Sequence, residues 1–251
     1  MKYKRLIPLI TPILIWLLSQ AFLRWPDFFY SALAVGALLI VISVKHLVGS
    51  GKKNWLSFII TPVLFFLCFS GYTAIIISHF WIQAIFLLEL WFFFSYLRVA
   101  YYYINHSGPQ WASKLDNLLI SGGFLTAFAA AALLFGLPIF LDWPLFIMLF
   151  VFTLIISLLL WQFNLLREDG APAINWLLII IIIILTELVW AMTFLPLNFN
   201  ILGLFAAIIY YLGLTMIRLE RRGGLNRRAL KLPLIFSAVL ILVLLLTARW
   251  L

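Results

Sequence analysis

The stretch WLLIIIIIILTELVWAMTFLP, residues 176–196, indicates what kind of protein this is. It contains six consecutive isoleucines, and Glu187 is its one ionisable side chain. At a rise of about 1.5 Å per residue, an apolar helix of this length matches the roughly 30 Å hydrocarbon core of a bilayer. A carboxylate at such a depth costs on the order of 3 kcal/mol. The stretch therefore predicts a transmembrane helix that carries one isolated acidic group.

The composition extends this interpretation to the whole chain of 251 residues. Hydrophobic residues make up 66% of it and charged residues only 10%, whereas soluble domains carry about 25% charged residues. The deficit predicts an all-α, polytopic integral membrane protein with no soluble domain. A net charge of +9 would suggest nucleic acid as a partner for a soluble protein. The expected membrane topology explains this charge instead, so no nucleic-acid partner is expected.

Nine spans are predicted within a single transmembrane domain covering residues 1–251. Consecutive spans are connected alternately by short polar or aromatic turns and by longer basic segments. The first span follows Lys2 and Lys4 and contains Ser19, which resembles part of a signal-peptide cleavage site. The apolar run continues beyond this point, which favours a retained span over a cleaved signal peptide. The predicted spans are residues 6–23, 28–47, 56–78, 81–103, 118–141, 144–166, 175–195, 199–218 and 231–249.

The distribution of lysine and arginine predicts the orientation. With the N-terminus cytoplasmic, 15 of the 17 Lys and Arg residues lie inside, and only Arg24 and Arg249 lie outside. The C-terminus is then outside, and a bacterial-type plasma membrane is the expected location. The loop near the eighth span concentrates positive charge that either sets the topology alone or also binds anionic lipid headgroups. Its basic residues are Arg218, Arg221, Arg222, Arg227, Arg228 and Lys231.

The fifth span differs from the others because small residues dominate it. Its sequence from residue 121 to residue 136 is SGGFLTAFAAAALLFG, with small side chains recurring every four residues. Small residues let helix backbones approach closely, which favours packing inside a membrane. We expect this helix at the centre of the bundle, with a dimer face as the alternative.

Two acidic residues lie well inside predicted spans: Glu89 in the fourth and Glu187 in the seventh. Each is eight residues from the outer end of its span, or about 12 Å below the outer interface. The two carboxylates are therefore expected at one depth. Candidate partners at a similar depth are Tyr72, Thr73, Tyr210 and Tyr211.

This pair has two interpretations. If the two helices touch, repulsion between the carboxylates means that at least one carries a proton, an arrangement suited to handling a proton or cation. The alternative is that each glutamate only forms a structural hydrogen bond between helices. The first interpretation predicts a small transporter or channel-like protein, and the second a non-catalytic scaffold or assembly subunit.

Other chemistry has little support in the sequence. The three histidines lie near predicted span ends, and familiar phosphate-binding, hydrolase and zinc motifs do not occur. We therefore expect no catalytic residue, no cofactor and no metal. An enzyme that acts on lipid-linked substrates is a weaker alternative, because it would depend on the sparse inner-side acids Asp116, Glu168 and Asp169.

Overall fold

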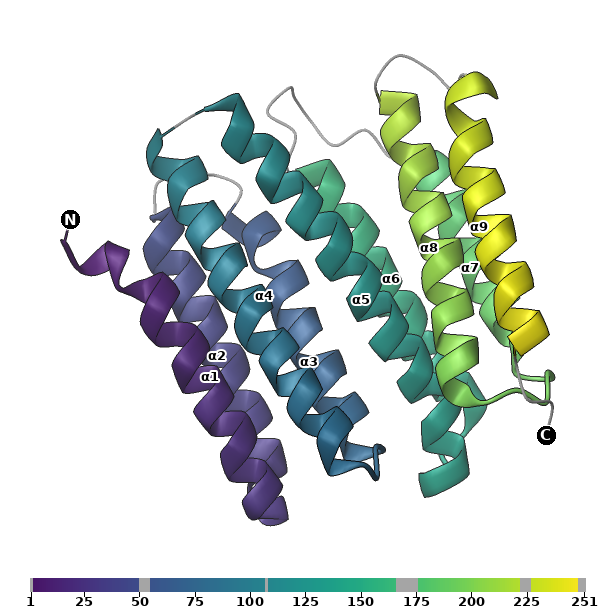
Figure 1. Ribbon diagram of the computed structural model, residues 1–251, viewed down its shortest axis with the longest axis horizontal. Helices are drawn as coiled ribbons and strands as arrows, with labels where there is room; N and C mark the ends of the chain where they lie inside the picture. Colours follow the sequence, from purple (N-terminus) through teal and green to yellow (C-terminus); the bar gives the residue numbers. More distant parts are fainter. Residues whose placement is uncertain (1, 50–54, 107, 166–175, 222–226, 248–251) are drawn as a thin grey trace. The chain divides into compact units, whose positions relative to one another are not determined.

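The computed structural model describes residues 2–49, 55–106, 108–165, 176–221 and 227–247, and every regular element in these ranges is a helix (Figure 1). Three short 3-10 turns, Lys2–Arg5 (η1), Pro26–Phe28 (η2) and Trp55–Phe58 (η3), precede longer helices. The α-helices are α1 (Ile7–Arg24), α2 (Phe29–Val48), α3 (Ile60–Ala74), α4 (His79–His106), α5 (Pro109–Leu141), α6 (Leu145–Leu165), α7 (Trp176–Met192), α8 (Phe199–Arg221) and α9 (Arg227–Thr247).

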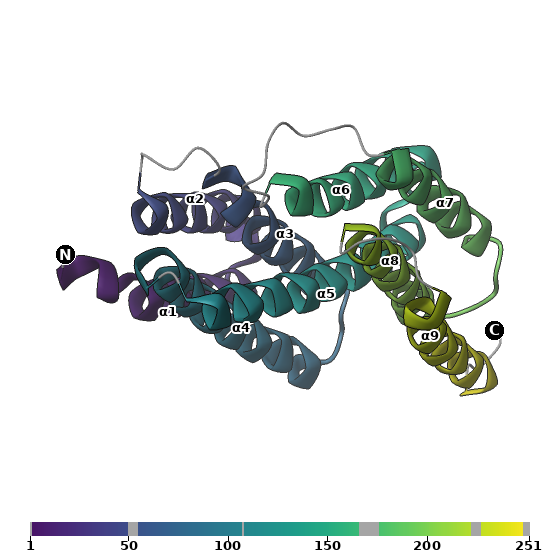
Figure 2. The same cartoon turned by 90° about the horizontal axis from the view of Figure 1, so that it is seen from above.

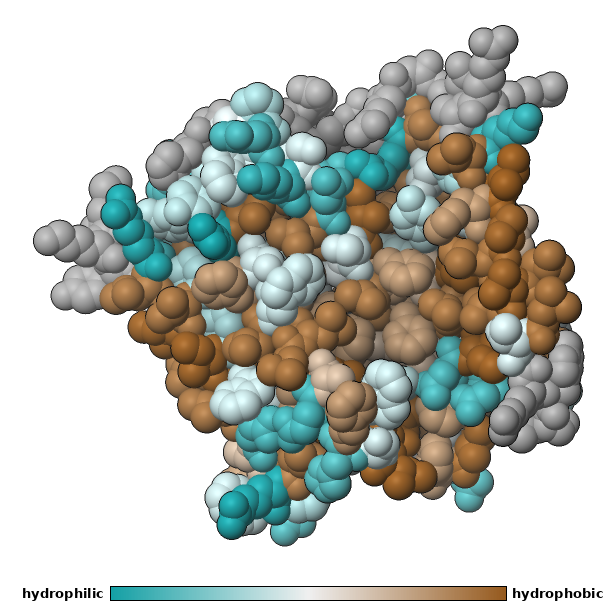
Figure 3. Space-filling view, in the orientation of Figure 1, coloured by the Kyte–Doolittle hydropathy of each residue, from teal (hydrophilic) through white to brown (hydrophobic). Residues whose placement is uncertain are grey.

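Eight helical segments are long and apolar enough to cross a membrane. The predicted all-α membrane bundle is confirmed at this level. Helix α7 contains the isoleucine run, but its 17 residues span only about 25 Å. The count of nine spans and the orientation stay predictions. Over α1 and α4, Figure 3 shows a band of hydrophobic residues between hydrophilic ends, as a bilayer requires.

Two helices differ in extent from their predicted spans. Helix α5 begins at Pro109, nine residues before the predicted start of its span. Proline at the first helical position is a helix-start signal that a hydropathy criterion does not register. Helix α3 is shorter than its span, because the chain first makes the η3 turn and the helix begins at Ile60. Pro62 thus lies in the first turn, where its missing N–H interrupts nothing.

The helices group into two compact units, Met1–Thr126 and Ala127–Leu251. The first unit, called unit 1 below, contains α1 to α4 and the beginning of α5. The second, called unit 2, contains the remainder of α5 and α6 to α9. Each unit is described separately.

In unit 1, α1 to α4 form a square of antiparallel neighbours, with α1 and α4 in one layer and α2 and α3 in the other (Figure 2). Aromatic packing holds α3 against α4: the rings of Phe65 and Phe92 stack with centroids 4.0 Å apart. Helix α2 approaches α3 closely because Gly36 has no side chain; a Cβ there would lie 2.3 Å from the ring of Phe66. These contacts fix the register of α2, α3 and α4.

The small residues of α5 are buried, as predicted for a central helix. Thr126, Ala127 and Ala131 are fully buried. Within unit 1, Gly122 lies against the ring of Phe92, and an added Cβ would come within 2.6 Å of it. Small side chains on α5 thus allow close packing, in line with their role in membrane helices.

Unit 2 is built from sequential neighbours: α6 packs on α7, α7 on α8, and α8 on α9. A hydrogen bond of 3.0 Å joins the hydroxyls of Thr153 on α6 and Thr186 on α7. Helix α9 contacts the unit through a narrow face that includes the buried Ser237, and most of its apolar side chains are exposed. Among the described residues, unit 2 exposes 26 large apolar side chains and unit 1 exposes 19.

Candidate functional site

The candidate site centres on Glu89, whose side chain is only 1% exposed. Helix α4 presents it to the interior of unit 1 together with Phe86 and Phe93, which lie three residues before and four residues after it and are fully buried. Residues at these spacings share one helix face. The apolar face that directs α4 into the core therefore also buries the carboxyl group.

Ser19 on α1 is the hydrogen-bond partner of this carboxyl group. Its hydroxyl lies 3.5 Å from Oε2 of Glu89 and also donates to the carbonyl oxygen of Ile15 at 3.1 Å. A hydroxyl has a single hydrogen, so it cannot donate fully to both acceptors. Both contacts are satisfied together when the carboxyl group carries a proton and donates to the Ser19 oxygen. The geometry is therefore sensitive to protonation of Glu89.

Three buried polar atoms of unit 1 have no hydrogen-bond partner among the residues that the structure describes: Oε1 of Glu89, Oγ of Ser70 and Nε1 of Trp16. In the antiparallel register, Ser70 on α3 lies at about the same level as Glu89 on α4. Phe66 packs on Phe93, and one turn further along each antiparallel helix are Ser70 and Glu89.

Trp16 belongs to the same region, because it lies three residues before Ser19 on α1 and packs against the cluster that includes Phe86. Buried polar groups are nearly always paired, so orphaned acceptors and donors grouped around one carboxyl group call for a functional explanation. The group formed by Trp16, Ser19, Ser70 and Glu89 is called the Glu89 cluster below.

Further polar pairs flank the Glu89 cluster along α1. Thr11 and Ser43 share a hydrogen bond of 2.8 Å between α1 and α2. On the other side of the cluster, the side-chain amides of Gln20 and Gln83 exchange hydrogen bonds of 2.7 and 3.2 Å between α1 and α4. Helix α1 therefore presents polar side chains at several successive levels of an otherwise apolar bundle.

Glu187 has very different surroundings. It is exposed on α7 in unit 2, on a face that also exposes Ile180, Ile183 and Ile184. Its neighbour Thr186 turns inward to Thr153. The two glutamates therefore belong to different units, and only Glu89 lies in a polar cluster.

The four residues expected to partner the glutamates lie in both units. Thr73 on α3 donates to the carbonyl oxygen of Ser70 at 2.7 Å, and the buried ring of Tyr72 packs on that of Phe69. Tyr210 and Tyr211 lie on α8 in unit 2, where the Tyr210 hydroxyl is buried without a partner. The carboxyl group of Glu89 is instead hydrogen-bonded to the hydroxyl of Ser19.

Sequence reasoning missed three members of the Glu89 cluster: Trp16, Ser19 and Ser70. A signal was present for Ser19, because it and Gln20 are polar residues in an apolar span. The same pair also resembles a cleavage site, and that resemblance obscured its structural meaning. Ser70 and Trp16 give no comparable signal, since their role depends on helix register.

The remaining charged residues that the sequence suggested as candidates form no second site among the described residues. Asp116 is half-buried at the start of α5, whereas Glu168, Asp169 and Arg222 lie outside the described residues. Within the part of the chain that the structure describes, no three His, Cys, Asp or Glu residues are placed to hold a metal ion. No match emerges when the chain is compared with known protein families, curated proteins and solved structures.

Proposed function

We propose that the chain is a small transporter or channel-like protein that carries protons through unit 1, with Glu89 as the proton-binding group. The observation that carries this proposal is the buried Oε1 of Glu89, which has no hydrogen-bond partner among the described residues. Ionisable residues buried within membrane bundles mark proton or ion pathways.

The chemistry of the cluster favours a proton over a metal cation. Cations such as Na⁺ or Ca²⁺ need several oxygen ligands, and Ca²⁺ takes six to eight. The Glu89 cluster offers one carboxyl group and two serine hydroxyls, whereas the indole N–H of Trp16 is a hydrogen-bond donor only and supplies no ligand for a cation. A proton needs a single acceptor.

Two hydrogen-bond arrangements follow from the geometry. In the protonated state, Glu89 donates to Ser19, and Ser19 donates to the carbonyl oxygen of Ile15. In the deprotonated state that we propose, the carboxylate accepts a hydrogen bond from Ser19 and attracts Ser70 and Trp16, whose buried donors have no partner among the described residues. Each protonation state of Glu89 pairs a different set of hydrogen-bonding groups, so Glu89 can bind and release a proton.

The test is proton flux into liposomes that contain the full chain. An internal pH-sensitive dye reports flux driven by a potassium diffusion potential. The Glu89→Gln variant keeps the shape of the side chain and removes its titration, so we expect flux at least tenfold lower than in the unchanged protein. The matched control is Glu187→Gln, which makes the same change on the exposed face of unit 2 and should retain flux. Equal flux in the unchanged protein and in Glu89→Gln would refute the proposal.

A second candidate function is a membrane assembly subunit without transport activity. The direct contact between Ser19 and Glu89 and the exposed apolar surface of α9 favour it. The same liposome experiment separates the two functions. An assembly subunit would give no more proton flux than protein-free liposomes, with or without Glu89.

A further inference from the structure

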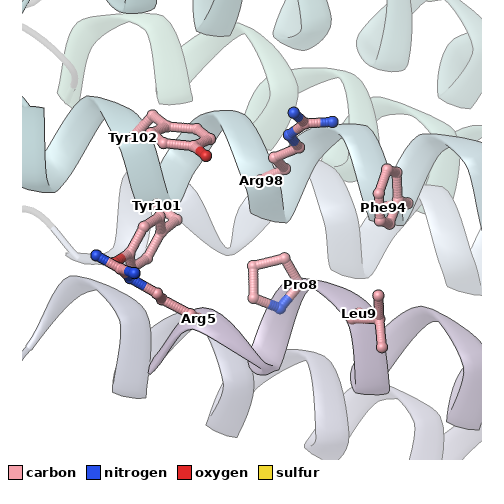
Figure 4. A pocket seen from close by; sticks show the side chains of 7 residues that line it. All are labelled: Arg5, Pro8, Leu9, Phe94, Arg98, Tyr101 and Tyr102. Carbon is pink, nitrogen blue, oxygen red and sulfur yellow. The ribbon is translucent and has the colours of Figure 1, made fainter. Parts of the chain in front are cut away.

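A pocket of about 480 Å³ opens between the first residues of α1 and the last turns of α4 (Figure 4). It lies in unit 1, at the end of the helices where the basic residues gather, and it is separate from the Glu89 cluster. Two arginines and two tyrosine rings line it beside apolar side chains. The residues that matter here are Arg5, Leu9, Phe94, Arg98, Tyr101 and Tyr102.

The pocket is strongly cationic. Nε of Arg5 donates to the hydroxyl of Tyr101 at 3.4 Å, and this hydrogen bond raises the pKa of Arg5. Arg98 lies over the ring of Phe94, 6.0 Å from its centroid. No acidic residue is among the described residues that line the pocket. Two guanidinium groups therefore share one pocket without a carboxylate to balance them.

Guanidinium groups match the geometry of phosphate oxygens. Each presents five N–H donors in a planar fork, and most of those donors on Arg5 and Arg98 remain available. The hydroxyl group of Tyr101, which accepts from Arg5, can also donate at the same rim. The chemistry of the pocket thus fits a phosphate group that approaches from outside the bundle.

An exposed apolar track continues from the pocket along α1 and α4. The two helices are antiparallel. Successive exposed residues of α1 therefore lie opposite successive exposed residues of α4 in the register, which gives three pairs. Leu9 and Phe94 meet at the pocket, and the next exposed residues along each helix follow at helical spacing. The pairs are Leu9 with Phe94, Ile13 with Trp91, and Leu17 with Leu87.

We infer that this pocket binds the phosphate of an anionic phospholipid, with the acyl chains lying along the apolar track. A free phosphate ion would use the arginines but would gain nothing from that track. The site is distinct from the basic loop at residues 218–231, and it does not depend on proton transport.

The experiment measures lipid selectivity of the full chain in phosphatidylcholine vesicles. Spin-labelled phosphatidylglycerol and phosphatidylcholine are compared by the fraction of each label that the protein immobilises. Replacing an arginine by glutamine should lower the preference for phosphatidylglycerol roughly fivefold in both Arg5→Gln and Arg98→Gln. The control Lys45→Gln removes a charge at the same end of unit 1, from a lysine that lies over the ring of Trp55 outside the pocket. It should leave the preference unchanged.

The variants should fold normally, because both arginines are exposed, and an unchanged thermal unfolding temperature would verify this. An unchanged preference in both arginine variants would overturn the inference. So would an equal loss in Lys45→Gln, since the preference would then reflect general surface charge. Displacement of the labelled lipid by millimolar inorganic phosphate would identify a free-phosphate site and overturn the assignment to lipid.

Discussion

Glu89 and Glu187 are the same residue type at the same expected depth, yet the structure gives them opposite surroundings. Glu89 is 1% exposed in unit 1 and contacts Ser19, whereas Glu187 is exposed on α7 among isoleucines. The difference arises from the neighbours of each helix. Helix α4 packs against α1, α2 and α3, whereas α7 packs against α6 and α8. Depth in the membrane therefore does not determine which side chain becomes buried.

The comparison also separates two kinds of packing. Unit 1 closes α1 to α4 around a core that contains polar pairs at several levels. In unit 2, α6 to α9 follow one another as neighbours and leave broad apolar faces exposed. In unit 1 the buried carboxyl group of Glu89 has a polar contact, the Ser19 hydroxyl of α1. The predictions below test this difference.

The largest expected effect comes from lysine at each glutamate position. Glu89→Lys places an uncompensated cation in the core of unit 1 and should reduce the free energy of unfolding by about 3 kcal/mol or more. Glu187→Lys should change it by less than about 1 kcal/mol, because an exposed lysine can extend its ammonium toward the interface. Unfolding in mixed micelles measures both values. Similar losses in the two variants would show that burial does not distinguish the two sites.

A smaller effect is expected from adding one methyl group at a helix contact in each unit. Gly36→Ala places a Cβ 2.3 Å from the ring of Phe66, which is itself buried, and should cost about 1–3 kcal/mol. Gly213→Ala places a Cβ 2.6 Å from the Cγ2 methyl group of the buried Ile181, the nearest atom there. Two ring atoms lie within 2.4 Å at Gly36, whereas at Gly213 the next atom is 3.9 Å away, so the loss at Gly213 should be smaller. The preference of alanine over glycine in helices, about 0.5–1 kcal/mol, offsets both losses equally. A greater loss of stability in Gly213→Ala than in Gly36→Ala would contradict our inference that helices pack more tightly in unit 1 than in unit 2.

The smallest effect concerns single interhelical hydrogen bonds. Ser19→Ala removes the partner of Glu89 and should cost about 1 kcal/mol, since it leaves a buried carboxyl group less satisfied. Thr186→Val removes the bond to Thr153 in unit 2 and should cost about 0.6 kcal/mol, the average for such bonds in membranes. Equal values would mean that the contact between Ser19 and Glu89 is an ordinary structural bond.

Much of the fold could be predicted from sequence because hydropathy directly reflects the solvent that a helix faces. The apolar runs located the helices, and Gly122 and its small neighbours indicated that α5 is closely packed. Hydropathy could not reveal the early start of α5 at Pro109, because five of the nine added residues are polar or charged.

The candidate site was predicted only in part. Glu89 stood out as an acidic residue in an apolar span, but the same criterion selected Glu187 equally. The rotation of each helix about its axis separates them, and that rotation depends on packing between helices distant in sequence. Ser19 reaches Glu89 across 70 residues of sequence, a pairing that no local pattern encodes. The pocket at Arg5 and Arg98 is likewise formed by two distant segments.

The most direct test of the central claim is to observe the proton on Glu89 by infrared spectroscopy. Difference spectra of the reconstituted protein between acidic and alkaline pH report carboxylic-acid C=O bands. We predict a pH-dependent band that is absent in Glu89→Gln and present in both the unchanged protein and Glu187→Gln. If the difference spectra of the unchanged protein and Glu89→Gln are identical, Glu89 does not exchange a proton and the account is contradicted.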